Sequence, residues 1–146
     1  MTRRFGVVAS MVALLSSTSV ARAHDGSLPA HDYLLSCGGC HKLDGSGSAH
    51  VPPLRGIDRL LAYPDGRAYV LHVPGVAQAP LSDARLAALL DWVFTQFGSG
   101  APTPGFTAAE VGRARAEPFV DPKAARVALG LADDCKRVSG SVCRRP

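Results

Sequence analysis

The most regular hydrophobic pattern in the chain lies between Ser82 and Gly98. Apolar side chains recur there at spacings of three and four residues, which places them along one face of an α-helix: Leu86, Leu89, Leu90, Val93, Phe94 and Phe97. Ser82 stands at the N-cap position, and Gly98 follows the last apolar residue as a helix stop. The pattern predicts an amphipathic helix between these two residues.

Shorter helical segments are predicted on both sides of this one. Residues 31–35 form a short helix in this interpretation, and residues 56–63 and 67–72 form two more, which Pro64 and Pro74 end. The segment after Gly98 has a linker composition. Two further short helices follow, and their signals are a capping box at Thr107 and Glu110, a hydrophobic staple of Phe106 and Val111, and the bracket Asp121, Pro122 and Gly130. We therefore expect a mainly α fold in which this C-terminal part packs against the core, because such short helices are marginal alone.

The first 23 residues have the pattern of a secretory signal peptide. Arg3 and Arg4 precede an apolar run from Phe5 to Leu15, and small residues end the segment at Ala23. The run is far shorter than the roughly 20 residues that span a bilayer. The sequence thus predicts export to the periplasm, no transmembrane segment, and a mature chain that begins near His24.

The charge of the chain changes once this segment is set aside. The formal net charge is +4, and Arg3, Arg4 and Arg22 of the signal account for three of these charges, which leaves +1. No basic cluster that could follow a phosphate backbone remains except Arg144-Arg145. We therefore expect no nucleic-acid partner.

A chemical motif stands at residues 37–41, where the sequence is Cys-Gly-Gly-Cys-His. This is the attachment pattern of c-type haem, in which both thiols add to the haem vinyl groups and the next imidazole becomes an axial iron ligand. Two alternatives exist for the cysteines. A thioredoxin-type disulfide would require a preceding strand, whereas a helix is predicted there, and a zinc site would have to use Cys135 and Cys143, whose spacing fits poorly. The motif predicts one covalent haem c held by Cys37, Cys40 and His41.

From the motif onward the chain resembles the class I monohaem cytochromes c, over about residues 30–97. Val51-Pro52-Pro53-Leu54-Arg55 matches the turn that covers the histidine side of the haem in that family. The resemblance implies that the Pro52 carbonyl accepts the second ring N–H of His41, that Leu54 packs on the haem, and that Arg55 pairs with a propionate. It also implies that the helix before the motif crosses the C-terminal helix, and we expect Tyr33 and Leu34 to contact Leu89 and Trp92 there.

One feature departs from the family pattern. The usual second axial ligand is a methionine before the C-terminal helix, and the only methionines here, Met1 and Met11, lie in the signal. His72 is the preferred replacement because it leads into the corresponding loop. The alternatives are an open or water-bound iron and a weak ligand such as Gln78; the remaining histidines, His24, His31 and His50, are less well placed.

We therefore expect three parts: the signal at 1–23, a cytochrome c domain at 24–98, and an extension at 99–146. Within the extension we expect Cys135 and Cys143 to form a disulfide, and two free thiols are the alternative. The leading hypothesis is a periplasmic electron carrier, not an enzyme, between a dehydrogenase and an oxidase or another cytochrome. A haem protein with an open iron position, acting as a gas sensor or on peroxide, is the second hypothesis. The third is a cytochrome subunit that grips a larger complex through its extension.

Overall fold

The structure, a computed structural model, describes residues 27–102 and 105–131. The predicted signal peptide, His24 and the pair Cys135 and Cys143 lie outside these residues. In the described part the chain is mainly helical and has no strand, as predicted. Its elements in order are α1 (Ser27–Ser36), α2 (Gly38–His41), the 3-10 helix η1 (Ile57–Ala62), α3 (Gly66–His72), α4 (Pro74–Ala77), α5 (Asp83–Phe97), α6 (Ala108–Arg115) and α7 (Pro122–Ala128).

The long helix α5 forms as its pattern predicts. The Ser82 hydroxyl accepts a hydrogen bond from the Arg85 amide at 3.3 Å, and Gly98 is the C-cap residue. All six apolar positions of the predicted stripe are buried. None of the described helices is both long and apolar enough to cross a membrane.

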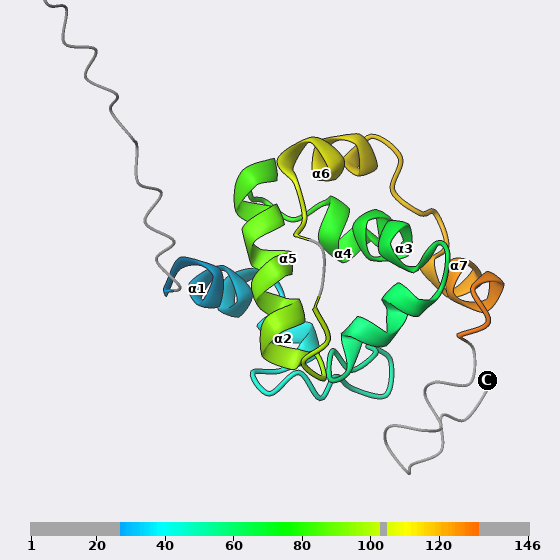
Figure 1. The fold of residues 1–146 in the computed structure, drawn as a ribbon, viewed down its shortest axis with the longest axis horizontal. Coiled ribbons are helices and arrows are strands. Elements are labelled where there is room, and N and C mark those ends of the chain that lie inside the picture. Colours follow the sequence, from blue (N-terminus) through cyan, green and yellow to red (C-terminus); the bar gives the residue numbers. More distant parts are fainter. Residues whose placement is uncertain (1–26, 103–104, 132–146) are drawn as a thin grey trace, which may run out of the picture.

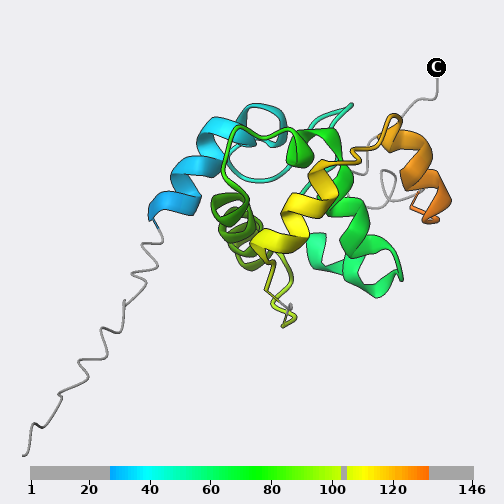
Figure 2. The same cartoon turned by 90° about the horizontal axis from the view of Figure 1, so that it is seen from above.

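Helix α1 packs against α5 on the side away from α7 (Figures 1 and 2). The rings of Tyr33 and Trp92 lie 5.4 Å apart, which confirms part of the predicted helix crossing. Asp32, which is buried, pairs with Arg85. Leu34, one position and about 100° further around the helix than Tyr33, is 52% exposed and is not part of the buried core.

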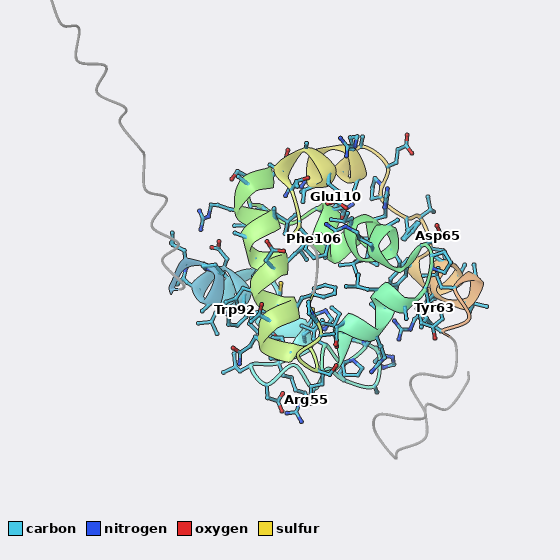
Figure 3. All side chains as sticks on the ribbon, viewed as in Figure 1. Arg55, Tyr63, Asp65, Trp92, Phe106 and Glu110 are labelled. Carbon is cyan, nitrogen blue, oxygen red and sulfur yellow. The ribbon has the colours of Figure 1, made fainter. Side chains whose placement is uncertain are left out.

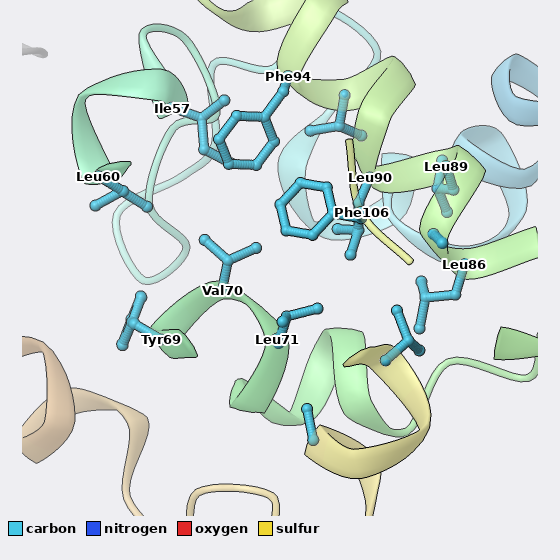
Figure 4. Close-up of a cluster of buried hydrophobic side chains, with 14 of the residues drawn as sticks. Ile57, Leu60, Tyr69, Val70, Leu71, Leu86, Leu89, Leu90, Phe94 and Phe106 are labelled. Carbon is cyan, nitrogen blue, oxygen red and sulfur yellow. The ribbon is translucent and has the colours of Figure 1, made fainter. Parts of the chain in front are cut away.

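The hydrophobic core lies where η1, α3 and α5 face one another (Figure 4). Ile57 and Leu60 come from η1, and Val70 comes from α3. Leu89 of α5 is 0% exposed. Segments far apart in the chain therefore share one core.

Replacing Leu89 with alanine should lower the free energy of unfolding by about 2–5 kcal/mol, since it removes buried methyl groups and leaves a void. Denaturant unfolding followed by circular dichroism measures this loss. Leu35→Ala is the matched control, because Leu35 is 74% exposed and should change stability by less than about 0.5 kcal/mol. Equal effects of the two substitutions would contradict the position of α5 in the core.

The helix α6 covers α3 and α5, as expected for the extension (Figure 2). Thr107 caps it, with its side-chain oxygen 3.2 Å from the Glu110 amide. The Glu110 carboxylate pairs with the Arg67 guanidinium at 2.5 and 2.8 Å, and this guanidinium also lies 4.2 Å from the centre of the Phe106 ring (Figure 3). Val111 is buried beneath the helix. Charge pairing and apolar burial together hold α6 on the core.

The segment after α6 returns to α3 before it enters α7. The Phe119 amide donates to the His72 carbonyl at 2.9 Å, and the Phe119 ring lies 5.8 Å from the ring of Tyr69. Asp121 then caps α7 by accepting from the Lys123 and Ala124 amides. Both predicted helices of the extension are therefore confirmed, and α7 begins beside α3.

Candidate functional site

The cysteine–histidine motif occupies a single helical turn that continues from α1. The Cys37 amide donates to the Tyr33 carbonyl at 2.9 Å, and the His41 amide donates to the Cys37 carbonyl at 2.9 Å. Cys37 and His41 are half-buried and Cys40 is exposed, and both thiols are free. The backbone thus brings the two sulfurs and the imidazole together within α2 and the residue before it.

The imidazole of His41 is fixed by the loop that follows. Its Nδ1 lies 3.0 Å from the Pro52 carbonyl oxygen, so Nδ1–H donates and Nε2 is left with its lone pair. Burial lowers the pKa of His41, and the Pro52 hydrogen bond opposes this effect. A neutral imidazole with one nitrogen held by a carbonyl is the form in which histidine binds metals. This is the bond that the family resemblance implied.

Gly47 gives this loop its shape. Its φ is +70°, and a Cβ atom there would lie 2.4 Å from the Val51 carbonyl oxygen and 2.9 Å from that of Pro52. The Gly47 amide also donates to the His41 carbonyl at 3.0 Å. The left-handed backbone at this residue therefore allows the loop to fold back and bring the Pro52 carbonyl to His41.

Replacing Gly47 with alanine should destabilise the protein by at least about 1–2 kcal/mol, because a left-handed residue gains a Cβ that meets backbone atoms. The loop must shift, and the His41 ring loses its fixed partner. Thermal unfolding measures the first effect, and the NMR shift of the His41 Nδ1 proton measures the second. Gly39→Ala is the matched control, since a Cβ at Gly39 meets nothing within 4 Å; a variant at Gly47 no less stable than this control would refute the strain.

An apolar cavity of about 370 Å³ lies next to the motif, and Cys37 and His41 form part of its wall. Its other walls come from the loop after the motif and from η1, α3, α4, α5 and α7, mostly with aliphatic side chains. Ligand cavities of this size with few polar groups hold small organic molecules or cofactors. The cavity therefore has the size and apolar lining of a site for a small organic group, and Cys37 and His41 open onto it.

The electrostatics of Cys37 bear on the alternative of a redox disulfide. Burial, with a smaller effect of Cys40, raises the pKa of Cys37 to about 11. Thiols of thioredoxin-type proteins instead have lowered pKa values, which keep the attacking sulfur as a thiolate. Near neutral pH Cys37 is therefore a protonated thiol beside an apolar cavity, unlike the attacking thiolate of a thioredoxin-type site.

The other residues predicted from the resemblance separate into two groups. Pro52 and Leu54 line the cavity. Arg55 is not among the lining residues, and it lies at the outer edge of the loop (Figure 3). Its guanidinium pairs with the Asp44 carboxylate at 2.6 Å and donates to the Asp44 carbonyl at 2.9 Å. The structure thus gives Arg55 a role in closing the loop and does not bring it to the cavity.

His72 is also absent from the cavity wall. Its Nδ1 lies 2.7 Å from the Ala68 carbonyl oxygen, one turn earlier in α3, and its ring lies 5.4 Å from that of Phe119. These contacts direct the side chain toward the extension. Of the other candidate ligands, His50 lines the cavity from the loop that carries Pro52, whereas Gln78 and His31 are exposed residues outside the lining.

Sequence reasoning missed two polar residues of the wall. Tyr69 of α3 and Arg126 of α7 both line the cavity. Tyr69 stands in a predicted helix, and its inward position follows only from the packing of that helix. Arg126 lies 85 residues after His41, and no local signal connects them.

Neither a search for metal-binding groups nor comparison with known proteins assigns a function to the site. In residues 27–102 and 105–131, no group of three or more His, Cys, Asp and Glu side chains could hold a metal ion. A haem iron needs only axial ligands from the protein, so a single histidine is compatible with it. Comparisons with protein-family models, with curated proteins and with solved structures found no match to this chain.

Proposed function

We propose that this chain is a class I-like c-type cytochrome that carries electrons in the periplasm with one covalently attached haem. The observation that carries the proposal is the apolar cavity of about 370 Å³ whose wall includes Cys37 and His41 of the Cys-x-x-Cys-His motif. A redox disulfide would need no such cavity. The bound haem would supply the reversible one-electron couple, and separate proteins, a dehydrogenase and an oxidase or another cytochrome, would supply and accept the electron.

Residues of this chain would perform three tasks in that function. Cys37 and Cys40 hold the cofactor through thioether bonds, and His41 provides the imidazole that faces the iron. The Pro52 carbonyl, 3.0 Å from His41 Nδ1, fixes the ring and raises its basicity. The aliphatic wall excludes water, which controls the reduction potential.

The test is to express the full chain in a host that attaches haem to exported proteins, and to purify the exported product. We expect one haem that stays bound after denaturation, a corresponding mass increase, and reversible one-electron reduction in a film voltammogram. A colourless protein that folds and unfolds cooperatively, with both thiols titratable, would overturn the proposal.

A specific observation favours a second candidate, a haem protein that binds small ligands at iron. The part of the wall contributed by residues 73–79 has no side chain that could bind iron. It consists of Val73, Pro74, Gly75, Val76 and Ala79. His72 instead contacts the Ala68 carbonyl. In this candidate the iron keeps an open position against an aliphatic wall, where a neutral diatomic gas would bind in preference to an anion.

A further inference from the structure

The wall segment 73–79 is tied to the C-terminal extension at both of its ends. The carbonyl of His72, the residue just before the segment, accepts a hydrogen bond of 2.9 Å from the Phe119 amide. The carbonyl of Ala79, its last residue, accepts one of 2.7 Å from the Arg115 guanidinium. Both donors lie in the short stretch of chain that leads from the end of α6 to α7. This stretch therefore spans the whole wall segment.

Arg115 also reaches a group beyond the segment. Its guanidinium donates to the Asp83 carboxylate at 2.8 Å, in the first turn of α5. The side chain is 23% exposed, and its Nε is buried without a hydrogen-bond partner among the described residues. Burying part of a cation is unfavourable, so the bonds to Ala79 and Asp83 must offset the lost hydration. The guanidinium is thus fixed between α6 and the loop that joins α4 to α5.

The contacts from the extension reach the cavity only through the segment. Neither Arg115 nor Phe119 lines the cavity, whereas Val73, Val76 and Ala79 of the segment do. Within the segment, α4 is one helical turn of four residues, which is too short to be stable alone. The segment therefore depends on contacts with the rest of the protein for its position, and these include the two bonds from the extension.

We propose that residues 115–119 act as a brace that holds the wall segment against the cavity, with Arg115 as the positioning residue. This inference rests on the proposed function, in which the segment faces the sixth iron position. Steric access on that side of a haem determines whether small molecules can bind the iron. The brace keeps the wall from yielding, so the extension controls how readily an external ligand reaches the iron.

The test compares three full-length variants loaded with haem: Arg115→Gln, Arg115→Lys and Arg113→Gln. Glutamine removes the charge and the paired donors, whereas lysine keeps the charge but cannot reproduce the planar fork of the guanidinium. Arg113→Gln is the matched control. Arg113 lies two residues earlier in α6, is exposed and does not line the cavity, so this substitution removes the same charge from the same helix.

Two measurements report on the wall. Hydrogen exchange of the Ala77 and Gln78 amides, which bond to the Val73 and Pro74 carbonyls at 2.9 Å, reports local opening of the segment in the ferric protein. The Cys37 amide provides an internal reference for such opening outside the segment. The rate of carbon monoxide binding to the ferrous protein reports access to the iron.

We expect Arg115→Gln to speed exchange of the Ala77 and Gln78 amides about tenfold, the effect of losing one hydrogen bond from a charged donor. Exchange of the Cys37 amide should not change. Carbon monoxide should bind several-fold faster to the same variant, because the wall yields more often. Arg115→Lys should lie between Arg115→Gln and the wild type in both measurements.

Three results would contradict the brace. Exchange and binding rates of Arg115→Gln equal to those of Arg113→Gln would overturn it, and so would equally faster exchange at the Cys37 amide, which indicates a general loss of stability. Faster exchange with an unchanged rate of carbon monoxide binding would refute control of access. If Arg115→Gln does not retain haem, Arg115→Lys decides by the same comparison. Wild-type protein without covalent haem would instead overturn the proposed function itself.

Discussion

Replacing both Cys37 and Cys40 with serine should abolish covalent haem and, with it, the native packing of the core. Serine keeps the size and polarity of the side chain closest to cysteine but forms no thioether bond. Without a cofactor, the cavity of about 370 Å³ stands empty among core residues. The cavity is partly open, so its aliphatic wall would be exposed to water and would not pack on a bound group, which removes apolar burial that stabilises the core. A single domain has only about 5–15 kcal/mol of stability, so the apoprotein should lose fixed tertiary structure.

Three measurements test this expectation on the exported chain. Haem content after denaturation reports attachment, and far-ultraviolet circular dichroism reports remaining helix. Near-ultraviolet circular dichroism reports Trp92 of α5, the single tryptophan, whose ring lies 5.4 Å from the ring of Tyr33. The matched control is the Cys135→Ser, Cys143→Ser variant, which makes the same chemical change in the tail and should retain haem. A haem-free Cys37→Ser, Cys40→Ser protein with the near-ultraviolet spectrum of the wild type would show that the fold does not depend on a cofactor.

The helices of this chain were predictable because their signals are local. In α5 the apolar stripe, the Ser82 cap and Gly98 all agree, and the observed ends, Asp83 and Phe97, coincide with them. The caps Thr107 and Asp121 defined α6 and α7 in the same way. The short α4 was missed, since four residues starting at Pro74 carry no periodicity. Local hydrogen bonding and apolar spacing thus determine most of the described secondary structure.

The residues of the candidate site could be predicted only where they lie close together in the sequence. Cys37, Cys40 and His41 share one helical turn, and Pro52, which bonds to His41, lies eleven positions after it. The side chains of Arg55 and His72 are placed by partners that the sequence does not reveal. These partners are the Asp44 carboxylate for Arg55 and the Phe119 ring for His72. Their side chains follow tertiary contacts.

In the proposed haem protein, the side chain that would occupy the sixth iron position also depends on such contacts. Whether one does so distinguishes the electron carrier from the ligand-binding candidate. His72→Ala should leave the optical spectra of the ferric and ferrous protein unchanged, since the His72 ring lies against Phe119 and bonds to Ala68. The spectra of the two proteins, recorded side by side, check this. A low-spin wild type that becomes high-spin in the variant would instead identify His72 as a ligand. It would then support an electron carrier whose iron is bound by His41 and His72.

The largest spectroscopic effect should come from Val76→Met. Val76 lines the cavity from α4, in the segment where class I cytochromes carry their methionine. The open-site candidate predicts a wild type that is high-spin and binds carbon monoxide in the ferrous state. A thioether at residue 76 should make the iron low-spin, raise its potential because methionine favours ferrous iron, and slow carbon monoxide binding.

Val127→Met is the matched control for Val76→Met. Val127 lies on α7 with 61% of its surface exposed, so the same substitution there changes composition without placing sulfur at the cavity. Its spectra and carbon monoxide kinetics should match those of the wild type. A Val76→Met protein that also matches the wild type would mean that the aliphatic segment 73–79 does not face the iron, and the open-site candidate would lose its one structural support. A wild type that is already low-spin and resists carbon monoxide would have an internal ligand, and His50, which lines the cavity, would be the residue to replace next.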